Sequence, residues 1–520
     1  MTVALPPGPF NMARFCLAPA PHRDPGRLGL VVTHDIEHPA SGAERWTYAD
    51  LDDAVRAVAH GLLDLGLEPG ERIVLRLGDT SDFALAFFGA IAAGIVPVPT
   101  SDQLTAEEVG YLASDCEAAA LAVAPGLAVT SGMPAVGPAD LARWRAGRER
   151  TDYALSDADD PAFIVYTSGT SGEPKGVVHA HRSVWGRRPM HTAWLGIGEG
   201  DVVLHAGSFT WTYTLGVGLT DPWVVGATAV VHSGRRDAAA WPGVVEATGA
   251  SVFAAVPGVY RQLLRHADGA RLRDPSGPLR SLRHAVTAGE ALTPTLLEQW
   301  RAATGLELYE ALGMSEVSTF VSSGPGTPVR PGSPGRPQPG RRIAVLPVEG
   351  GDQPLPVGAH GLLAVHRSDP GLMLGYWERP EEDTAAWRGE WFVSGDLVHV
   401  DEDGYVHHHG RADDVMTSMG YRVSPLEVER VLARHPAVAD VAVAEAVVRD
   451  DGLRVVTAFV VPEAGVPFDA DDLLGHAREH LAAYKCPREV RVVDSLPRTS
   501  NGKVVRRVLA AGGGPSRERG

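Results

Sequence analysis

Cysteine is scarce in this sequence, and neither a long uncharged apolar run nor an excess of positive charge is present. The three cysteines, Cys16, Cys116 and Cys486, are far apart and odd in number. No disulfide framework or CxxC metal site is therefore expected, and a reducing cytoplasm is the simplest location. No apolar stretch is long enough to span a bilayer, and residues 1–14 lack the apolar core of a signal peptide. The net charge of −17 disfavours nucleic acids and anionic membranes as partners.

The sequence does contain enough apolar material for more than one domain. Its 520 residues are too many for a single hydrophobic core, and 44% hydrophobic with 21% charged residues is ordinary for a soluble globular protein. Thr47 and Asp50 form a capping box, apolar residues follow at helical spacing, and Gly66 ends that helix. A second apolar helix is expected over Phe83–Ala93.

Short apolar runs of strand length alternate with helices. They are Ile73–Leu77, Ile95–Val98, Val202–Leu204, Thr228–Val231, Val252–Val256 and Leu306–Tyr309. This alternation predicts a parallel sheet covered on both faces, because each crossover helix packs back onto the sheet. We therefore expect an α/β fold with several layers.

The pattern becomes more compact after Gly410–Asp414. Before it, Gly324–Arg342 is rich in Pro, Gly and Arg and predicts a loop that leads into short β elements. After it, the expected elements are helices at Pro425–Arg434 and Asp471–Ala483 and strands at Val438–Val448, Leu453–Val461 and Glu489–Val493. We therefore expect a large N-terminal multi-layer α/β domain over residues 1–410, a small mobile C-terminal α+β domain over 411–509, and a disordered tail over 510–520.

The segment Tyr166–Gly176, with the sequence YTSGTSGEPKG, is the most informative part of the chain. It combines three glycines, four hydroxyl side chains and Lys175, and it follows the apolar run Ala162–Val165. Glycines let backbone N–H groups turn toward anionic oxygens, hydroxyls donate further hydrogen bonds, and a lysine supplies a point charge. The segment therefore predicts a polyphosphate site with ATP as the ligand. Its spacing does not fit the Walker pattern, which disfavours a P-loop NTPase; a flexible surface turn is the alternative.

Two further clusters place polar side chains at a strand end and at a turn. Tyr309–Glu316 follows a strand, at the edge where open α/β sheets place ligands. Its Glu316 suits Mg²⁺, and the alternative is a solvated loop glutamate. Ser394–Asp396 places an aspartate after a tight glycine turn, where it can accept hydrogen bonds from ribose hydroxyls, although aspartate is common in turns.

Two clusters belong to the second domain. Gly410–Asp414 with Gly420–Pro425 places charged residues at the domain junction, as a hinge, a helix cap or a salt-bridged linker. Leu496–Lys503 places a lysine on a protruding Asn-Gly turn, from which it can reach the cleft of another domain. The alternative is an ordinary surface lysine.

Two groups of histidines are discounted as metal sites. His407–His409 precede Gly410 on an expected strand, where alternate side chains face opposite ways, so at most two can share a ligand. No acidic or cysteine partner stands at metal-binding spacing, and short histidine tracts are weak signals. We expect His179 and His181 to be structural or to lie beside the ATP site.

In this order, the five polar clusters resemble the adenylate-forming superfamily. This superfamily comprises acyl- and aryl-CoA synthetases, adenylation domains of nonribosomal peptide synthetases, and luciferases. The resemblance extends from Thr47 to Arg507, nearly the whole chain. The family motifs are matched by Tyr166–Gly176 (phosphate loop), Ser315-Glu316 (Thr-Glu), Ser394-Gly395-Asp396 (Thr-Gly-Asp), Gly410–Asp414 (hinge) and Gly502-Lys503 (C-terminal lysine).

The resemblance implies a role for each matched residue and three ligands, ATP, Mg²⁺ and coenzyme A. The catalytic residues would be Lys503 on the substrate carboxylate and α-phosphate, Glu316 on Mg²⁺, and Asp413 as the hinge. The nucleotide would be bound by Thr167, Ser168, Gly169, Thr170, Ser171, Gly172, Lys175, Gly289, Glu290, Glu310, Ala311, Leu312, Ser315, Asp396 and Arg411. The acid and CoA would be contacted by Trp211, Gly313, Gly420, Tyr421 and Arg422.

Within the superfamily, the sequence is most similar to medium-chain and benzoate-type CoA ligases. The segments that carry this similarity are Arg388–Asp396, Gly420–Glu429 and Tyr484–Pro487, and Trp211 stands where these relatives place an aromatic residue that gates the acyl pocket. The sequence departs from these relatives at two places that bear on the identity of the acid. Thr417 stands where many aryl-CoA ligases have a lysine, and Trp211-Thr212-Tyr213 replaces the usual Gly-Trp pair.

The resemblance implies an ATP-dependent acid–CoA ligase. It would form an acyl-AMP with release of pyrophosphate and then, after rotation of the small domain about Asp413, transfer the acyl group to a thiol. The acid would be aromatic or of medium chain length. A separate carrier protein is the alternative acceptor, and a nucleotide-binding protein without ligase chemistry is the alternative of another class. No nucleic acid or membrane partner is expected, and a homodimer is also considered.

Overall fold

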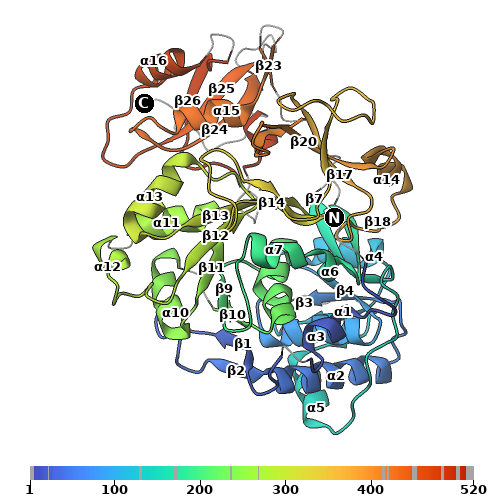
Figure 1. Cartoon of the computed structure of the whole chain (residues 1–520). Coiled ribbons are helices and arrows are strands. Elements are labelled where there is room, and N and C mark those ends of the chain that lie inside the picture. The colour runs from blue at the N-terminus through green and yellow to red at the C-terminus, as the bar shows by residue number, and fades with distance from the viewer. Residues whose placement is uncertain are drawn as a thin grey trace.

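The structure is a computed structural model of the chain. It describes residues 5–20, 23–127, 132–168, 174–234, 237–266, 269–412, 416–418, 421–447, 454–481, 485–498 and 504–510. Helices and strands are mixed throughout, which confirms the α/β class. Figure 1 shows a large N-terminal part below and a smaller C-terminal part, coloured orange to red, above it.

A nine-stranded sheet forms the centre of the large part. Its strand order is β15-β14-β13-β12-β11-β9-β10-β1-β2. The six strands from β13 to β1 are parallel, whereas β14 and β15 at one edge and β2 at the other are antiparallel. The bounds are β1 (Leu28–Thr33), β2 (Glu44–Thr47), β9 (Val202–His205), β10 (Thr228–His232), β11 (Val252–Ala255), β12 (His284–Ala288), β13 (Leu308–Met314), β14 (Ser318–Ser322) and β15 (Arg336–Pro337).

Helices cover both faces of this sheet, as the alternation of strands and helices predicts. On one face Leu30 and Val32 of β1 pack in a core with α2 (Tyr48–Asp64) and α3 (Ser81–Ala92). On the other face Val31 packs in a core with α10 (Trp241–Thr248), α11 (Pro257–His266) and α13 (Pro294–Thr304). Consecutive residues of β1 therefore pack into opposite cores. This is why Leu30, Val31 and Val32 are all apolar.

The expected capping box is present at the start of α2. The Thr47 hydroxyl accepts the N–H of Asp50, and the Asp50 carboxylate accepts the N–H of Thr47.

A second, four-stranded sheet follows, with the order β4-β3-β5-β6, in which all neighbouring strands are parallel. Its strands are β3 (Arg72–Arg76), β4 (Val96–Pro99), β5 (Ala118–Val123) and β6 (Ala135–Val136).

Two smaller sheets are also present in the large part. The first has the order β18-β8-β7, with β7 (Pro161–Ser168), β8 (Pro174–Ala180) and β18 (Gly375–Tyr376). The second is β16-β17-β20-β19, with β21 also paired to β20. Its strands are β16 (Ile343–Leu346), β17 (Gly361–His366), β19 (Trp387–Arg388), β20 (Trp391–Val400) and β21 (Val406–Arg411).

Two local predictions are wrong. Ser394–Asp396 does not form a tight turn but lies inside β20, where Gly395 has a φ of +76° and residues on both sides pair with β17 or β21. The strand expected at Leu306–Tyr309 extends to Met314, because the residues after Tyr309 pair with both β12 and β14. In both cases pairing with distant strands overrides the local turn signal of glycine.

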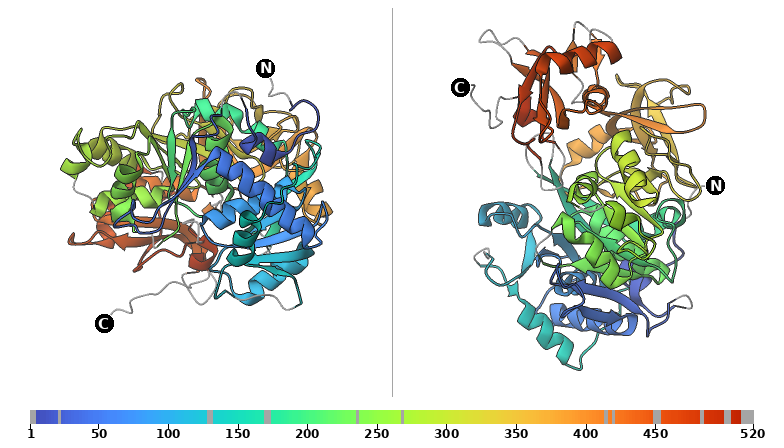
Figure 2. Two further views of the ribbon diagram at one scale, coloured as in Figure 1. Left: turned by 90° about the horizontal axis from the view of Figure 1, so that it is seen from below. Right: turned by 90° about the vertical axis from the view of Figure 1, so that its left-hand side faces the viewer.

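The C-terminal part is an α+β unit, as expected. Its strands β24 (Val438–Val447), β25 (Arg454–Pro462) and β26 (Glu489–Val492) form one sheet, and β22 (Met416–Ser418) pairs with β23 (Tyr421–Val423). Its helices are α15 (Pro425–Leu432), α16 (Ala470–His480) and α17 (Arg506–Ala510). From the side in the right panel of Figure 2, this orange and red unit stands above the blue and green N-terminal part. Residues 511–520, most of the expected tail, lie outside the described residues.

The remaining elements connect these sheets. They are α1 (Met12–Leu17), α4 (Ala106–Asp115), α5 (Pro138–Ala146), α6 (Ser183–Gly186), α7 (Arg188–Ala193), α8 (Thr212–Leu215), η1 (Gly216–Thr220), α9 (Asp221–Val225), η2 (Ala238–Ala240), α12 (Gly269–Arg273) and α14 (Pro380–Ala386). Among the described residues, no helix combines the length and apolarity needed to cross a membrane. The three cysteines are buried and form no disulfide.

Candidate active site

The predicted phosphate segment lies at the end of the β7–β8 hairpin. Thr167 of β7 is paired with Lys175 of β8, so both lie beside the loop that joins the two strands. The predicted nucleotide-binding residues Gly169, Thr170, Ser171 and Gly172 lie outside the described residues, and the side chain of Ser168 does as well. The described part of the motif is therefore its base, two paired antiparallel strands that carry Thr167 and Lys175.

A tyrosine joins Lys175 to Glu316. The Lys175 ammonium forms an ion pair with Glu382 of α14 and lies 5.5 Å from the centre of the Tyr376 ring. The Tyr376 hydroxyl in turn donates a hydrogen bond to Glu316 Oε1, at 2.8 Å. Burial, and then the charge of Glu316, raise the pKa of Tyr376 well above its ordinary value, so the hydroxyl remains a donor. The structure thus brings together the predicted phosphate and Mg²⁺ residues.

Asp115 fixes the other side of this hairpin. Its carboxylate accepts hydrogen bonds from the Tyr166 hydroxyl, at 2.6 Å, and from Arg379, at 2.7 Å, while its carbonyl accepts the Trp377 indole N–H at 2.9 Å. Tyr166 belongs to β7, and Trp377 and Arg379 follow β18. These charge-assisted contacts hold β18, and with it Tyr376, against the phosphate hairpin.

Gly289, Glu290, Glu310, Ala311 and Leu312 meet at the carboxyl ends of β12 and β13. These strands are parallel, with Ala288 opposite Ala311, and the φ of +94° at Gly289 turns the chain away from β12. The structure therefore brings together all five residues that were predicted to line the adenine and acyl sites. This is the edge of a parallel sheet at which ligands are expected.

Glu310 is buried and points back into the protein. Its Oε1 accepts the backbone N–H of Leu292 at 2.8 Å, which holds the loop after β12. Burial raises the pKa of Glu310 to about 7, although the Leu292 N–H and Arg430 of the C-terminal part act in the opposite direction. Near neutral pH this carboxyl group is therefore a mixture of both protonation states.

Glu290 contacts the C-terminal part of the chain. Its Oε1 lies 3.3 Å from Nη1 of Arg498, whose Nη2 lies 2.8 Å from Asp440 Oδ2. Arg498 belongs to the predicted lysine segment, Leu496–Lys503, whereas Lys503 itself lies outside the described residues. This ion pair brings the base of that segment to the strand edge that carries the predicted nucleotide residues.

Gly313 and Ser315 lie where β13 meets β14. A Cβ atom at Gly313 would lie 2.4 Å from the Ser318 carbonyl oxygen and 2.6 Å from Thr319 Cα, so close backbone approach requires the glycine. Ser315 follows Met314, the last residue of β13. Burial, and then the charge of Arg187, lower the pKa of His179 to about 3. A neutral His179 stacks on Phe163 at 4.5 Å, consistent with the expected structural role.

Asp396 and Arg411 face each other across β20 and β21. The two residues are paired in register, and Arg411 Nη1 donates to the Ser394 carbonyl at 2.6 Å and lies 3.8 Å from Asp396 Oδ1. Asp396 is buried and is also contacted by Nε2 of His408, at 3.2 Å. The structure therefore brings together the two predicted ribose residues.

Trp211 and its neighbour Tyr213 lie at the start of α8. Trp211 and Tyr213 are both half-buried, and the Tyr213 ring lies beside those of Trp194 and His205, with ring centres 5.9 and 4.5 Å apart. The Tyr213 hydroxyl lies 3.4 Å from the carbonyl oxygens of Ala255 and Val286. Tyr213 thus reaches the carboxyl ends of β11 and β12.

The predicted residues of the second domain are only partly described. Tyr421 and Arg422 lie on β23, opposite Ser418 and Thr417 of β22, but their side chains are outside the described residues. Asp413 and Gly420 also lie outside them.

Tyr376, Glu382, Arg498 and Tyr213 were not predicted as site residues. Tyr376 stands sixty positions after Glu316 in the sequence, and no periodicity or motif spacing links the two. Arg498 lies inside a predicted segment, but arginine on a turn gives no sign of its partner. Only the pairing of β18 with β8, and the position of the C-terminal part, reveal these contacts.

Comparison with known proteins agrees with this geometry. Residues 23–377 match the model of the family "AMP-binding enzyme", and residues 427–503 match "AMP-binding enzyme C-terminal domain". The chain is 34% identical to the benzoate–CoA ligase of Thauera aromatica over 89% of this chain and 90% of the relative. It is 32% identical to the 3-hydroxybenzoate–CoA ligase of Aromatoleum sp. (strain CIB), over 91% and 93%.

Solved structures show the same similarity over nearly the full length. A benzoate CoA ligase from Burkholderia xenovorans LB400 superposes with a TM-score of 0.85 at 31% identity, covering 96% of this chain and all of that one. The anthranilate CoA ligase AuaEII, in complex with anthranoyl-AMP, superposes with a TM-score of 0.87 at 29% identity over 98% of both chains. The chain therefore belongs to the AMP-binding enzyme family, within the adenylate-forming superfamily, and is an AMP-forming acid–CoA ligase.

Proposed function

We propose that the acid which this ligase activates is aromatic and of the benzoate type. The first relatives are named for benzoate and hydroxybenzoate, and the compared structures include ligases named for benzoate and anthranilate. Within the chain, the Tyr213 side chain reaches the carboxyl ends of β11 and β12, and Trp211 stands two residues before it in the sequence. Aromatic side chains stack favourably on a flat aromatic substrate.

The observation that carries the nucleotide part of the proposal is the line of contacts Lys175–Tyr376–Glu316. A cation next to a hydroxyl and a carboxylate, at the base of a glycine- and hydroxyl-rich hairpin, suits a polyphosphate with its metal ion. Asp396 and Arg411, one on each strand of a neighbouring hairpin, offer an acceptor and a donor for ribose hydroxyls.

Glu316 fits the Mg²⁺ that the family implies. Mg²⁺ prefers carboxylate and phosphate oxygens, and the Tyr376 hydroxyl already orients one oxygen of this carboxylate. When bound, the ion would offset the charge of the phosphates. Lys175 would hold the β- and γ-phosphates, and Glu316 would hold the ion beside them.

Lys503 and the small domain would complete the reaction. A carboxylate is a poor acyl donor, and its attack on the α-phosphorus gives a mixed anhydride and releases pyrophosphate. The Lys503 ammonium would offset the negative charge that this step concentrates. Rotation about Asp413 would then withdraw Lys503 and bring Gly420, Tyr421 and Arg422 to the CoA channel. The contact of Arg498 with Glu290 supports a position of the lysine segment close to the nucleotide edge.

An acid panel tests the substrate. We expect benzoate and substituted benzoates to drive pyrophosphate release, with AMP and the aryl-CoA as products, at a higher kcat/KM than aliphatic acids of short or medium chain length. A preference for aliphatic acids in the same assay would contradict the aromatic assignment. In parallel, free CoA and a phosphopantetheinylated carrier protein are compared as acceptors of the acyl group. Transfer to the carrier alone would show that the carrier protein, and not free CoA, is the acceptor.

The two lysines of the C-terminal part form a matched pair for testing the catalytic role. Lys503→Ala is expected to lower acid-dependent pyrophosphate release by roughly 100-fold or more, while thioester formation from supplied acyl-AMP continues. Lys485→Ala, which removes an ion pair with Glu427, is the control and is expected to leave pyrophosphate release near the wild-type rate. Normal adenylation by Lys503→Ala would show that the lysine assignment is wrong.

A further inference from the structure

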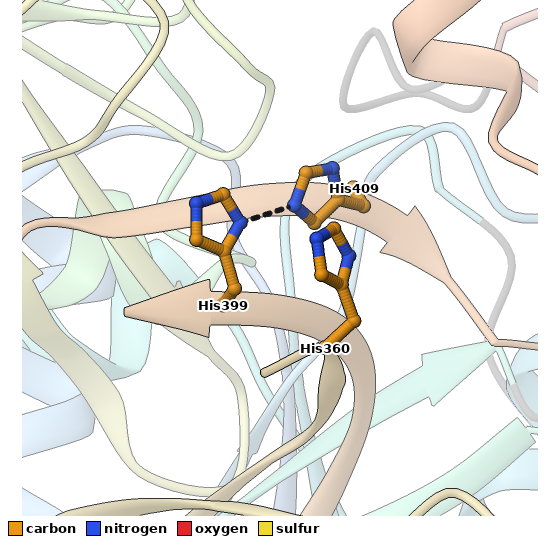
Figure 3. A group of neighbouring side chains, drawn as sticks. All are labelled: His360, His399 and His409. Atoms are coloured by element: carbon orange, nitrogen blue, oxygen red, sulfur yellow. Dashed lines mark hydrogen bonds between the residues drawn. The ribbon is translucent and has the colours of Figure 1, made fainter. Parts of the chain in front are cut away.

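Three histidines from three separate segments converge beside the β20–β21 hairpin. His360 precedes β17, His399 lies near the end of β20, and His409 lies on β21. Each offers one ring nitrogen, and these three atoms all lie within 4.8 Å of one another. Figure 3 shows the three rings turned toward a common point, with a hydrogen bond between His399 and His409.

A divalent cation could be held here after small side-chain movements. Two nitrogens bound to one tetrahedral Zn²⁺ lie about 3.3 Å apart, given Zn–N bonds of about 2.0–2.1 Å. The distance from His399 Nδ1 to His409 Nε2 is 2.7 Å, so these rings would separate by about 0.6 Å. From the outer limit of 4.8 Å, the His360 nitrogen would move inward by up to about 1.5 Å. Rotation about side-chain bonds supplies such movements without any change of the backbone.

The protonation state of His399 and His409 is compatible with metal binding. Burial lowers the pKa of His409 to about 3, and His360, His399 and Arg430 act in the same direction. Burial and then His407 and His360 also lower the pKa of His399. Neutral imidazole is the form that binds a metal. The shared proton of the His399–His409 hydrogen bond needs only to move to the other nitrogen of its ring, so no charge is created.

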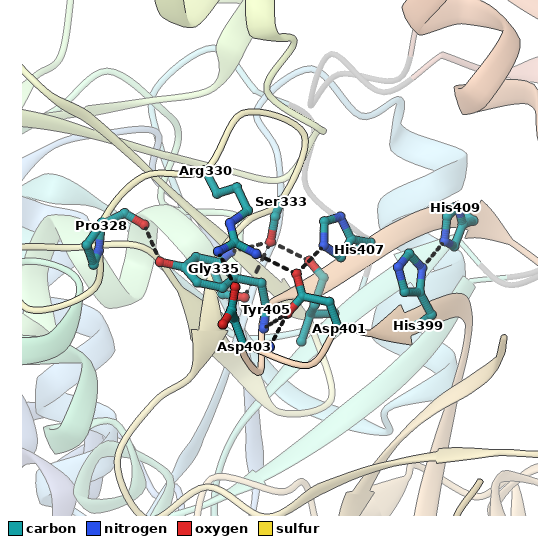
Figure 4. A network of polar contacts seen from close by, with 11 residues as sticks. Pro328, Arg330, Ser333, Gly335, His399, Asp401, Asp403, Tyr405, His407 and His409 are labelled. Atoms are coloured by element: carbon teal, nitrogen blue, oxygen red, sulfur yellow. Dashed lines mark hydrogen bonds and ion pairs between the residues drawn. The ribbon is translucent and has the colours of Figure 1, made fainter. Parts of the chain in front are cut away.

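Polar side chains contact the cluster through His407. His407 stacks on His399, with ring centres 4.6 Å apart, and its Nε2 lies 2.9 Å from Asp401 Oδ2. Arg330 pairs with the same Asp401 oxygen at 2.6 Å, and Figure 4 shows this network running from Arg330 to the histidines. Burial would raise the pKa of Asp401, but hydrogen bonds from His407 and the Tyr405 N–H lower it to about 2.

We propose that His360, His399 and His409 form a binding site for a borderline divalent cation, with Zn²⁺ as the preferred ion. Three imidazoles with a fourth position left for water is a donor set that suits zinc, and it offers no hard oxygen ligand for Mg²⁺. His360 is exposed whereas the other two rings are half-buried, so an ion could enter from the side of His360 and keep a water molecule there. The site is distinct from Glu316.

The sequence pattern does not predict this site. Alternation along β21 was expected to leave only two histidines of the triplet on one face, and indeed His407 and His409 both contact His399, whereas His408 contacts Asp396. The remaining ligands come from another strand and from the loop before β17, far from the triplet in sequence. An ion here would tie that loop to β20 and β21, which also carry Asp396 and Arg411.

Metal titration of the full chain, prepared without a histidine tag and freed of metal by chelation, tests the proposal. We expect one Zn²⁺ per chain by calorimetry at neutral pH. His360→Ala and His409→Ala are each expected to weaken this binding by roughly 100-fold. His366→Ala is the matched control, since His366 lies at the far end of β17 and contacts Ser368; it should leave the affinity unchanged. Binding that persists undiminished in both cluster variants would overturn the proposal, as would absence of binding to the wild type.

Anomalous scattering from crystals of the wild-type chain grown with equimolar Zn²⁺ gives a second readout, which does not depend on how well the variants fold. A single peak between His360, His399 and His409 is expected. A peak elsewhere, with none at the three histidines, would show that the titrated ion binds at another place and that the cluster is only a stack of neutral rings.

Discussion

At the scale of single residues, Glu310 is a carboxyl group whose protonation is strongly shaped by its surroundings. It is buried on β13, its pKa is raised to about 7, and it accepts the N–H of Leu292. In the unfolded chain its pKa returns to about 4.5. Because the folded pKa is the higher one, the folded form binds the proton more tightly. The stabilisation of the fold by this tighter proton binding is therefore fully present below pH 4.5 and is lost as the pH rises through 7.

Glu310→Gln is expected to remove that part of the pH dependence. The amide keeps an acceptor for Leu292 N–H but does not titrate. Between pH 5 and pH 8 the wild type should lose roughly 2 kcal/mol of unfolding free energy that the variant retains. Urea unfolding at both pH values measures the difference. Glu307→Gln, which changes an exposed ion pair with Arg301, is the control, and an equal pH dependence in all three proteins would contradict the assignment.

Among the residues of the candidate site, those inside a motif could be predicted and their partners could not. Lys175 and Glu316 were predicted because each stands in a short segment with a recognisable order of residues. The roles of Tyr376 and Glu382 were not, because a contact between segments far apart in sequence has no periodic signal. The histidine cluster was missed for the same reason, since its ligands come from three segments.

At the scale of elements, β18 is only two residues long but links two halves of the candidate site. It pairs with β8, so that Tyr376 stands opposite Val177 and reaches from Lys175 to Glu316. The strand is held by Asp115 through Trp377 and Arg379. Through Tyr376, this short strand therefore orients the Glu316 carboxylate.

Tyr376→Phe tests this role of β18. The ring stays under Lys175, but Glu316 loses its 2.8 Å hydrogen bond. A lost hydrogen bond to a charged group is worth about 1.5–3 kcal/mol, so the Mg²⁺ concentration for half-maximal pyrophosphate exchange should rise by roughly 10-fold. Tyr405→Phe, which removes a hydroxyl bonded to the Pro328 carbonyl, serves as the control. An unchanged Mg²⁺ requirement in Tyr376→Phe would exclude this orienting role for its hydroxyl.

The elements themselves were largely predictable where a local signal decides them. The Thr47–Asp50 capping box fixes the start of α2, and apolar runs locate the buried parallel strands. The ends of β13 and the interior of β20 were not predictable, because Gly313 and Gly395 signal turns. Gly313 is instead required by the close backbone of β14, and Gly395 by its φ of +76°.

At the scale of the whole molecule, Arg498 connects the two parts of the chain. It lies between Asp440 of the C-terminal part and Glu290 of the large part. The side chains are only partly exposed, at 26% for Arg498 and 14% for Glu290. We propose that this ion pair stabilises the present arrangement of the two domains, with the boundaries 1–410 and 411–509 that the change of pattern predicts.

Glu290→Gln is expected to weaken the contact between the two domains, because it removes an ion pair that joins them. Asp440→Asn is not expected to do so, because Asp440 and Arg498 both belong to the C-terminal part. An interdomain pair of this kind contributes about 1 kcal/mol, which corresponds to a roughly fivefold change in the populations of domain arrangements. Small-angle X-ray scattering at low ionic strength would show a wider distribution of shapes for Glu290→Gln. High salt should produce the same change in the wild type, because salt screens the pair. Identical scattering of the two variants would count against this role.

The deep position of every cysteine makes this rearrangement observable. Cys16, Cys116 and Cys486 are 0%, 0% and 7% exposed, and burial raises the pKa of the first two thiols to about 12. Thiolate, the form that reacts with maleimides, is therefore scarce at these positions. Two cysteines introduced on the surface, one on each domain, would take up fluorescent dyes while the native thiols stay unlabelled. Energy transfer between the dyes would then follow the small domain through a single turnover, with the three native cysteines left in place.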